Sequence, residues 1–424
     1  MTRETATFLR VAVAAAAALG GTRGLAAQAA ASAGPGAGGG LHGLVLYDRV
    51  NPIPGGGSAG EVRLIHPVAM AHATALDGRL RFTGMLNFEG LTIADGQLAP
   101  GVWGEGYVDR RHPHTYLHEA VLTWRDRIPL GGRGLAVSLS AGKGFAPFGS
   151  DDPMSRPVIR YPVNHHLAQV LERLVGILAL RTGPVLLEGA LFNGDEPDSP
   201  GQWPNAGRFG DSWAARLTIF PVDGLELQGS LATIASPEFR PGGALGHDKW
   251  SVSARVERQA GAQRFYGLAE YARGDEGDGA FSFSSFLAEA AWGTGPHQLH
   301  YRFERTARPE EQRLNDLWRT PRPHHDFSVL GSSRWAIHTL GYAFEVPGFH
   351  GIRLTPVIEG SLGRVTSLTP ASFDPDMLYG RDAFWTLSAG VRVGWGARLH
   401  RMGRYGAAEA PAGAAPQPGA DHAH

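Results

Sequence analysis

The charged residues with the most suggestive spacing lie in and beside a proline-rich connection, residues 144–172. Its four prolines stiffen the chain, so this segment would narrow any passage into which it folded. Charged side chains that line a constriction select which ions pass. We therefore predict an anion-attracting constriction, opposed by two aspartates; the alternative is an external loop with its charges in solvent. The residues assigned to it are Lys143, Arg156, Arg160, Arg173, Asp151 and Asp152.

Histidine is frequent in the chain, with 18 residues, and several of these occur in clusters. Imidazole is a good ligand for zinc, copper or nickel. The candidate metal ligands are His165, His166, His324 and His325, which we expect on the external side of the protein. Scattered imidazoles in polar loops are the simpler interpretation, so the sequence predicts no cofactor and no resident metal.

Catalytic chemistry finds little support in the sequence. The chain has no cysteine, which excludes a thiol nucleophile and thiolate metal sites. Serine-hydrolase elbows, phosphate-binding loops and zinc-protease motifs do not occur in it. The neighbouring acids Asp151 and Asp152 could mimic a hydrolytic site, although adjacent acids in a loop are usually solvated. We therefore expect no enzyme, and a net charge of −1 offers no basis for binding nucleic acid.

The elements that position these residues are strands. From Trp385 to Leu399, odd positions are apolar and even positions are polar or glycine. Side chains alternate across a strand, so one face is apolar and the other is wet. The run is longer than the roughly 9–11 residues that a tilted strand needs to cross a bilayer. The pattern is typical of a transmembrane β-barrel.

Segments with compatible patterning, separated by alternating short and long connections, predict an all-β antiparallel barrel of about 16 strands. Short turns rich in Gly, Pro and Asp are expected on the periplasmic side, and long loops such as 144–172 and 273–282 on the outside. The final strand should pair with the first, closing the barrel. The expected strands are 43–50, 63–73, 79–88, 115–124, 134–143, 173–181, 185–193, 212–220, 225–233, 249–258, 263–272, 284–292, 298–306, 335–346, 351–363 and 384–399.

The two ends of the chain differ in composition from the barrel. Residues 1–29 have a basic start, a short apolar core and an Ala-x-Ala site, as a secretory signal does. Residues 30–42 are expected to form a flexible linker, and 43–399 the barrel. Residues 400–424 are rich in Ala, Gly and Pro and are expected to form a disordered periplasmic tail.

Part of the sequence resembles the phosphate-selective O/P porins of bacterial outer membranes. The similarity covers about 140–230 and includes residues 142–149, the pair Glu172-Arg173, residues 189–195 and the turn 221–224. The resemblance implies a sixteen-stranded, trimeric diffusion channel with an inward third loop. Phosphate selectivity in that family rests on a lysine-rich pore, and this chain has no lysine cluster.

These observations predict a passive channel for small hydrophilic solutes or anions in the outer membrane of a Gram-negative-type bacterium. Its expected partners are membrane lipid, the solutes and two further copies in a homotrimer. One alternative is a structural or adhesive barrel without conductance, which a lumen filled by the 144–172 loop and inward Arg/Glu pairs would favour. Another is a metal-related outer-membrane channel that uses external histidines.

Overall fold

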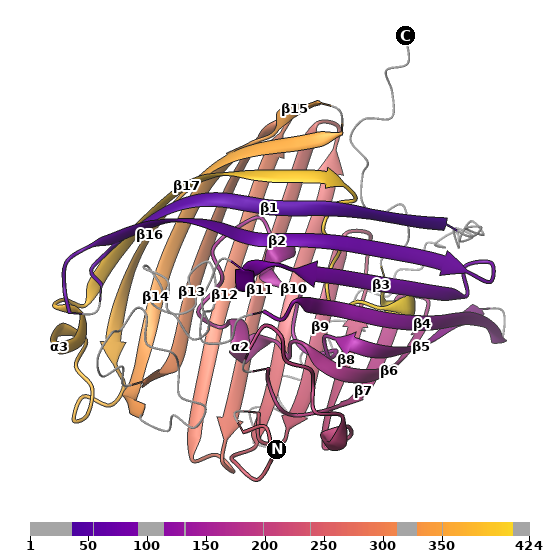
Figure 1. The fold of residues 1–424 in the computed structure, drawn as a ribbon, viewed down its shortest axis with the longest axis horizontal. Coiled ribbons are helices and arrows are strands. Elements are labelled where there is room, and N and C mark those ends of the chain that lie inside the picture. Colours follow the sequence, from indigo (N-terminus) through magenta and orange to yellow (C-terminus); the bar gives the residue numbers. More distant parts are fainter. Residues whose placement is uncertain are drawn as a thin grey trace.

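The chain forms a closed antiparallel β-barrel in the computed structural model, which describes residues 36–53, 55–91, 114–130, 133–197, 199–237, 239–311, 329–349 and 351–409. The signal peptide expected at 1–29 and residues 410–424 lie outside the described residues. All strands belong to one sheet, which wraps fully around an interior (Figure 1). The fold class predicted from the sequence is therefore confirmed.

Every expected strand has a counterpart in the structure. The strand bounds are β1 (Gly36–Asn51), β2 (Ala59–Ala75), β3 (Leu80–Asn87), β4 (Leu117–Leu130), β5 (Arg133–Gly144), β6 (Arg173–Thr182), β7 (Val185–Phe192), β8 (Ser212–Ile219), β9 (Leu225–Ile234), β10 (His247–Ala260), β11 (Gln263–Glu276), β12 (Phe281–Thr294), β13 (His297–Glu311), β14 (Val329–Phe344), β15 (Val346–Phe349), β16 (Ile352–Ser367) and β17 (Ala383–Gly396). Because β14 and β15 follow each other directly and both pair with β16, they act as one bent strand, and the barrel has sixteen.

The seam of the barrel joins its first and last strands, as the sequence predicted. β1 and β17 pair in an unbroken antiparallel register from Gly40 opposite Gly396 to Asn51 opposite Trp385. Each remaining strand pairs with its neighbours along the chain, so the topology is a simple meander. Closure leaves no unpaired edge, which is the condition for a sheet to span a bilayer.

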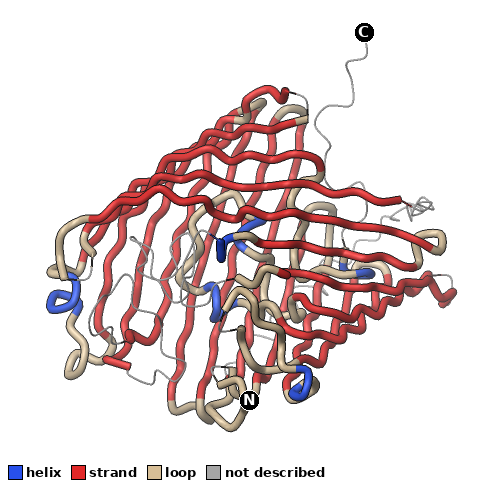
Figure 2. Tube along the Cα trace, in the orientation of Figure 1, coloured by secondary structure: helices blue, strands red, loops and turns tan. Residues whose placement is uncertain are grey.

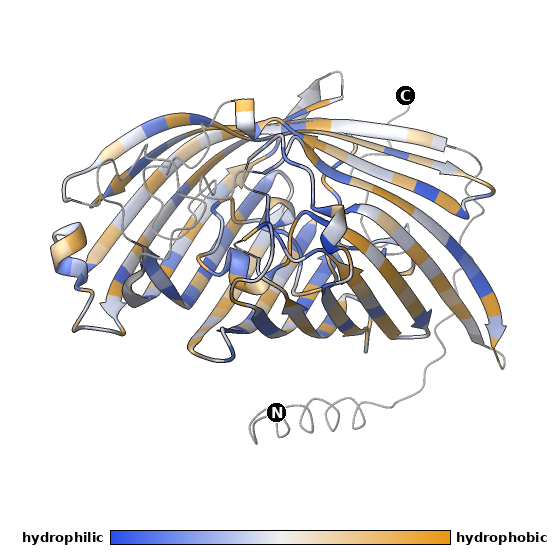
Figure 3. Ribbon diagram, turned by 60° about the horizontal axis from the view of Figure 1, so that its bottom comes forward, coloured by the Kyte–Doolittle hydropathy of each residue, from blue (hydrophilic) through white to orange (hydrophobic). Residues whose placement is uncertain are grey.

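The two faces of the wall differ in polarity, as the alternation in the sequence predicted (Figure 3). On β17, Leu387 and Trp395 point outward and are 47% and 52% exposed, whereas Thr386 and Ser388 point inward and are buried. Leu340 on β14 and Leu362 on β16 are also exposed apolar residues. The outside is therefore suited to lipid and the inside to polar contacts.

Several strands are longer than expected, and two of the differences change the assignment of a whole segment. Residues 36–42, assigned to the linker, belong to β1, because their glycines permit a close approach of backbones: a Cβ on Gly39 would lie 2.5 Å from the Met70 carbonyl oxygen. The long connection expected at 273–282 is only 277–280, since β11 and β12 extend further than their alternation indicated. Both errors come from judging flexible or polar residues as loop.

In the ranges that the structure describes, helical segments are few and short (Figure 2). They are α2 (His165–Ala168), α3 (Pro375–Tyr379) and the 3₁₀ turns η1 (Glu89–Leu91), η2 (Pro153–Ser155), η3 (Ala206–Arg208) and η4 (Gly406–Ala408). Among the described residues, no helix is long and apolar enough to cross a membrane.

Candidate functional site: a lumen filled from two directions

The connection between β5 and β6 folds into the barrel. It carries η2 and α2, and α2 lies within the barrel outline, packed on β11 and β12 rather than on its own flanking strands (Figure 1). We call residues 145–172 the inward loop. Its apolar residues Phe148, Ile159 and Val163 are buried against wall residues of different strands. The loop therefore crosses the lumen, which agrees with the inward constriction and not with the alternative of an external loop.

Carboxylates of the far wall anchor the inward loop by its main chain. The Ile159 nitrogen donates to Glu359 of β16 at 2.7 Å, and the Val163 nitrogen donates to Glu304 of β13 at 2.6 Å. The side chain of Asn164 adds a third bond, from its Nδ2 to Glu270 of β11 at 3.1 Å. Hydrogen bonds to an ionised acceptor are stronger than neutral ones. These anchors fix the loop across the barrel.

The four cations predicted for the constriction are all buried, and the structure does not gather them into one ring. Arg156 lies 3.4 Å from Glu289 of β12 and also donates to the Asp151 carbonyl. The Arg160 carbonyl accepts from Arg302 of β13. These two positions face the β12–β13 wall.

The other two predicted cations lie on the opposite side of the loop. Arg173, at the start of β6, pairs with Glu196 at 2.9 Å and donates to the Leu171 carbonyl. Lys143, at the end of β5, donates to the Leu117 carbonyl at 2.7 Å and to the Thr115 hydroxyl. Lys143, Arg156 and Arg173 thus each have acceptors of their own, which reduces the positive field that they offer to a passing anion.

The two predicted acids separate, although they are adjacent in sequence. Asp152 caps η2 by accepting from the Met154 nitrogen at 2.8 Å, and it faces His165 at 3.6 Å. Asp151 faces the other way, toward Arg255 of β10 and Arg401. Asp152 therefore shapes the loop, while Asp151 belongs to a separate ionic cluster.

Histidines line the opposite side of the inward loop. His114 lies 3.0 Å from Glu89, and His118 of β4 hydrogen-bonds Glu172. Burial opposes ionisation of Glu89 and His114, but their hydrogen bond and mutual attraction outweigh it. The pKa of Glu89 falls to about 2, and that of His114 rises to about 9. The pair is therefore an internal ion pair that holds the approach to β4 against η1.

The metal hypothesis gains nothing from these positions. His165 and His166 were expected outside, but they form part of α2 inside the barrel, where the His165 ring stacks on Tyr161 at 4.5 Å between centroids. His324 and His325 lie outside the described residues. Within the part of the chain that the structure describes, no group of three or more His, Asp or Glu side chains could hold a metal ion.

The segment after β17 enters the lumen, contrary to the expected tail from residue 400. In residues 400–409, which we call the C-terminal insert, Met402, Arg404, Tyr405 and Ala408 are all buried. Its η4 packs against β4, β5, β6 and β7. The expectation was wrong for these residues because their arginines and tyrosine find partners on the wall; the biased composition begins only after Tyr405.

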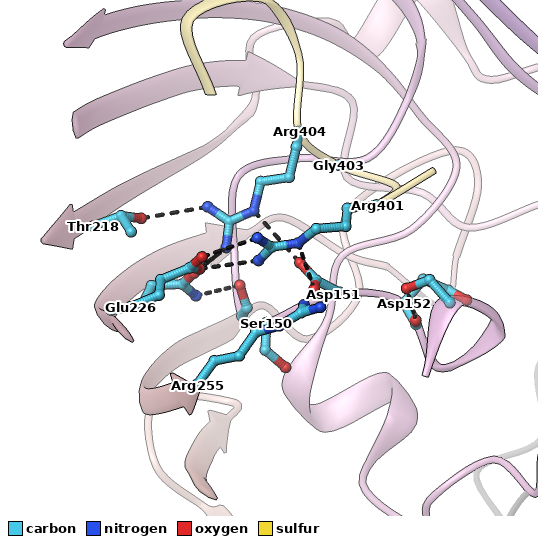
Figure 4. Close-up of polar contacts among 12 residues, drawn as sticks. Ser150, Asp151, Asp152, Thr218, Glu226, Arg255, Arg401, Gly403 and Arg404 are labelled. Carbon is cyan, nitrogen blue, oxygen red and sulfur yellow. Dashed lines mark hydrogen bonds and ion pairs between the residues drawn. The ribbon is translucent and has the colours of Figure 1, made fainter. Parts of the chain in front are cut away.

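Two arginines hold the insert on the β7–β9 wall. Arg401 forms a two-bond fork with Glu226 of β9, at 2.9 and 3.0 Å, and its Nε donates to Asp151 at 2.7 Å. Arg404 donates to Glu226 at 2.7 Å and to Gln228. Figure 4 shows both guanidinium groups turned toward Glu226, with Arg255 on the other side of Asp151.

The far end of the insert is seated by its tyrosine and a glycine. The Tyr405 hydroxyl donates to Glu119 of β4 at 2.6 Å and accepts from the Phe145 nitrogen of the inward loop at 3.2 Å. Gly406 has a φ of +58°, and a Cβ there would lie 2.5 Å from the Ser138 Cβ. Only glycine fits this seat without a shift of the wall. The inward loop and the insert are thus in direct contact.

Several functional residues escaped the sequence analysis. The glutamates Glu270, Glu289 and Glu359 lie at inward-facing strand positions. The alternation of the strands predicts that they face the lumen, but it does not predict which residue of the inward loop each one contacts. Arg401 and Arg404 were assigned to a tail, yet the run 400–405 contains two arginines, a histidine and a tyrosine. This departure from the Ala/Gly/Pro composition could have indicated that the segment is ordered.

Comparison with known proteins returns barrels of the outer membrane. No family model and no curated sequence matches the chain. Similar solved structures include the anion-selective porin from Comamonas acidovorans, with 11% identity, a TM-score of 0.45, and coverage of 85% of this chain and 99% of that one. The outer-membrane expressed OmpT of Vibrio cholerae has 9% identity and a TM-score of 0.47, with coverage of 85% of this chain and 98% of that one. OpdQ of Pseudomonas aeruginosa has 9% identity and a TM-score of 0.43, with the same coverage of the two chains. At these values no function is carried over to this chain, since one fold hosts many functions.

Proposed function

We propose that the protein is an outer-membrane channel of the porin class, through which small hydrophilic solutes diffuse. The observation that carries the proposal is the closed sixteen-strand wall, apolar outside and charged inside, around the inward loop. Barrels of this size enclose an aqueous channel unless their interior is filled. A diffusion channel requires no catalytic residue, cofactor or energy source.

Localisation follows from the same wall. A continuous outer face with exposed Leu340, Leu362 and Leu387 would be costly in water and suits the bilayer core. Together with the signal sequence expected at 1–29, this supports the outer membrane of a Gram-negative-type bacterium. We extend the proposal to a homotrimer and to membership of the phosphate-selective O/P porin family, which rest on the sequence resemblance.

The selectivity that we propose is a weak preference for anions. Arg156 and Arg173 bring positive charge to the inward loop, but Glu289 and Glu196 lie beside them and offset most of it. A narrow path beside such paired charges discriminates less than a ring of lysines would. Phosphate specificity is therefore not part of the proposal.

Single-channel recording in planar bilayers under a salt gradient tests the function. We expect small discrete currents whose reversal potential indicates a preference for anions. In the Arg156→Gln/Arg173→Gln variant, the reversal potential should shift toward zero. Arg364→Gln is the matched control, because Arg364 is exposed and pairs with Asp382 away from the lumen. The absence of current from the wild type and from variants that open the lumen would reject the channel, and a cation preference of the wild type would reject the role of the two arginines.

A structural barrel without conductance is the second candidate. The buried pairs Arg216–Glu188 and Arg302–Glu289, at 2.6 and 2.7 Å, together with the inward loop and the insert, occupy much of the interior. This candidate predicts no current from the wild type and none from variants that loosen the lumen. The two candidates are therefore separated by variants of the C-terminal insert.

A further inference from the structure

The C-terminal insert occupies a site built for guanidinium groups. Two arginines of the insert converge on one wall carboxylate, Glu226, and both also pair with Asp151, Arg401 at 2.7 Å and Arg404 at 3.5 Å. A fork of two parallel N–H···O bonds is the geometry in which a carboxylate recognises guanidinium in preference to a simple ammonium. Gln228 and Thr218 supply further acceptors to Arg404, with the Thr218 hydroxyl at 3.3 Å.

The charges that remain on the wall favour a cation in this place. Without the insert, the cluster keeps three carboxylates, Asp151, Glu188 and Glu226, and two guanidinium groups, Arg216 and Arg255. Glu257, which also pairs with Arg255, adds a fourth carboxylate at the edge. Because buried carboxylates are costly without a partner, the vacated wall would attract a replacement for the lost arginines.

The insert is joined to the wall by contacts that can be exchanged. Most of its polar contacts are side-chain hydrogen bonds and ion pairs, and no strand of the barrel pairs with residues 400–409. Gly403 and Gly406 both have positive φ, so the backbone turns at two glycines within the insert. Displacing it would break no strand pairing of the closed barrel.

We propose that residues 400–409 are an internal ligand, and that the Glu226–Asp151–Glu188 cradle beneath them binds guanidinium-bearing solutes when the insert leaves. Arg401 and Arg404 then stand in for the side chains of such solutes, for example arginine or short arginine-containing peptides. While it is bound, the insert closes the side of the lumen that is lined by β4–β9. This inference rests on the proposed channel function and names one solute class for it.

Two full-length variants dislodge the insert by different means. Gly406→Val removes no charge, but its side chain would collide with Ser138. Arg401→Ala/Arg404→Ala leaves the seat but removes the guanidinium groups. The matched control is Gly183→Val in the β6–β7 turn, where φ is +52° and an added Cβ meets nothing within 4 Å. Recording single channels of all four proteins tests closure.

We expect both insert variants to conduct about twice as much as wild type, since the β4–β9 side of the lumen is freed, and Gly183→Val to match wild type. Equal conductance in all four would overturn the inference and leave the channel function standing. If none of the four conducts, the channel function fails and the inference fails with it. A silent wild type with conducting insert variants would support both.

The guanidinium ion itself tests the ligand class. Added to Gly406→Val, whose cradle is intact, it should block the current, whereas tetramethylammonium, which has the same charge but no N–H donors, should not. Adding Glu226→Gln should abolish the block, and wild type should show little of it. Equal block by the two cations, or block that survives Glu226→Gln, would overturn the assignment of the cradle.

Discussion

The main-chain nitrogen of Ile159 donates to the carboxylate of Glu359 at 2.7 Å, which ties the inward loop to β16 on the far side of the barrel. The same carboxylate accepts from His300 of β13 at 2.8 Å. One wall glutamate thus holds both β13, which lies beyond β14 in the sheet, and a loop that starts at β5. The stability of the loop is therefore coupled to that of the wall.

Glu359→Ala should lower the free energy of unfolding by about 1–3 kcal/mol, because a buried N–H and an imidazole lose their acceptor. Channel currents should also become noisier as the loop loosens. Urea unfolding in lipid vesicles measures the first effect. Glu345→Ala is the control, since Glu345 pairs with Arg398 at the surface, and such pairs contribute about 0–1 kcal/mol. Equal losses in the two variants would contradict the anchoring role.

Glu188→Ala should destabilise the barrel more strongly, by about 3–5 kcal/mol, because it leaves Arg216 buried without its carboxylate. Replacing both residues by methionine should restore much of the stability, since no buried charge is then left unpaired. A double-mutant cycle from denaturation curves measures the coupling. Additive effects of the two single substitutions would show that the pair is not a unit.

The Glu89–His114 ion pair makes the stability of the contact between η1 and the approach to β4 depend on pH. The lowered pKa of Glu89 contributes stability above about 4.5, and this is lost as pH falls toward about 2. The raised pKa of His114 contributes stability below about 6.5, and this is lost as pH rises through about 9. We expect the free energy of unfolding to be nearly constant between pH about 4.5 and pH about 6.5, where both contributions are complete.

Thermal denaturation across this pH range tests the pair. Replacing His114 by Gln should flatten the alkaline decline, because the neutral amide does not titrate. His297→Gln serves as the control, since His297 lies at the start of β13 and bonds Tyr342 rather than a carboxylate. An unchanged alkaline decline in His114→Gln would assign it to another group.

Leu387→Arg should cost about 2–4 kcal/mol in bilayers, because it places a cation on the lipid-facing side of β17. Met377→Arg makes a similar change on α3, where the side chain is 85% exposed and outside the sheet. Folding yield into lipid vesicles, followed by resistance to heat in detergent, compares the two. Similar yields for both would argue against a lipid-facing β17.

The sequence predicted what depends on the period of a strand. Alternation identified the wall, its inward Ser388 and its outward Trp395, and the count of turns identified sixteen strands and the closing pair. Proline spacing and charge singled out the 144–172 connection as a candidate to enter the lumen.

Partners across the lumen could not be predicted, because they join strands that are distant in the chain. Nothing near Arg156 indicates Glu289, and nothing near Arg404 indicates Glu226. Composition alone also gives the wrong assignment at both ends of the barrel. At the first end, the glycines of 36–42 indicate a flexible linker, although close contacts between strands need them. The C-terminal insert could not be predicted either, because the composition of residues 400–424 carries no information about the carboxylates on β7 and β9 that hold its arginines.

The seam between β1 and β17 also dictates an order of assembly. Its two strands are the first and the last of the barrel, so the cylinder cannot close until β17 has been synthesised. Until then the sheet has two open edges, each able to pair with another chain. The arginines of the insert must reach their carboxylates either before this last zippering or through an open mouth of the finished cylinder. A chain cut before Ala383 would consequently lose its closing strand and its internal ligand together.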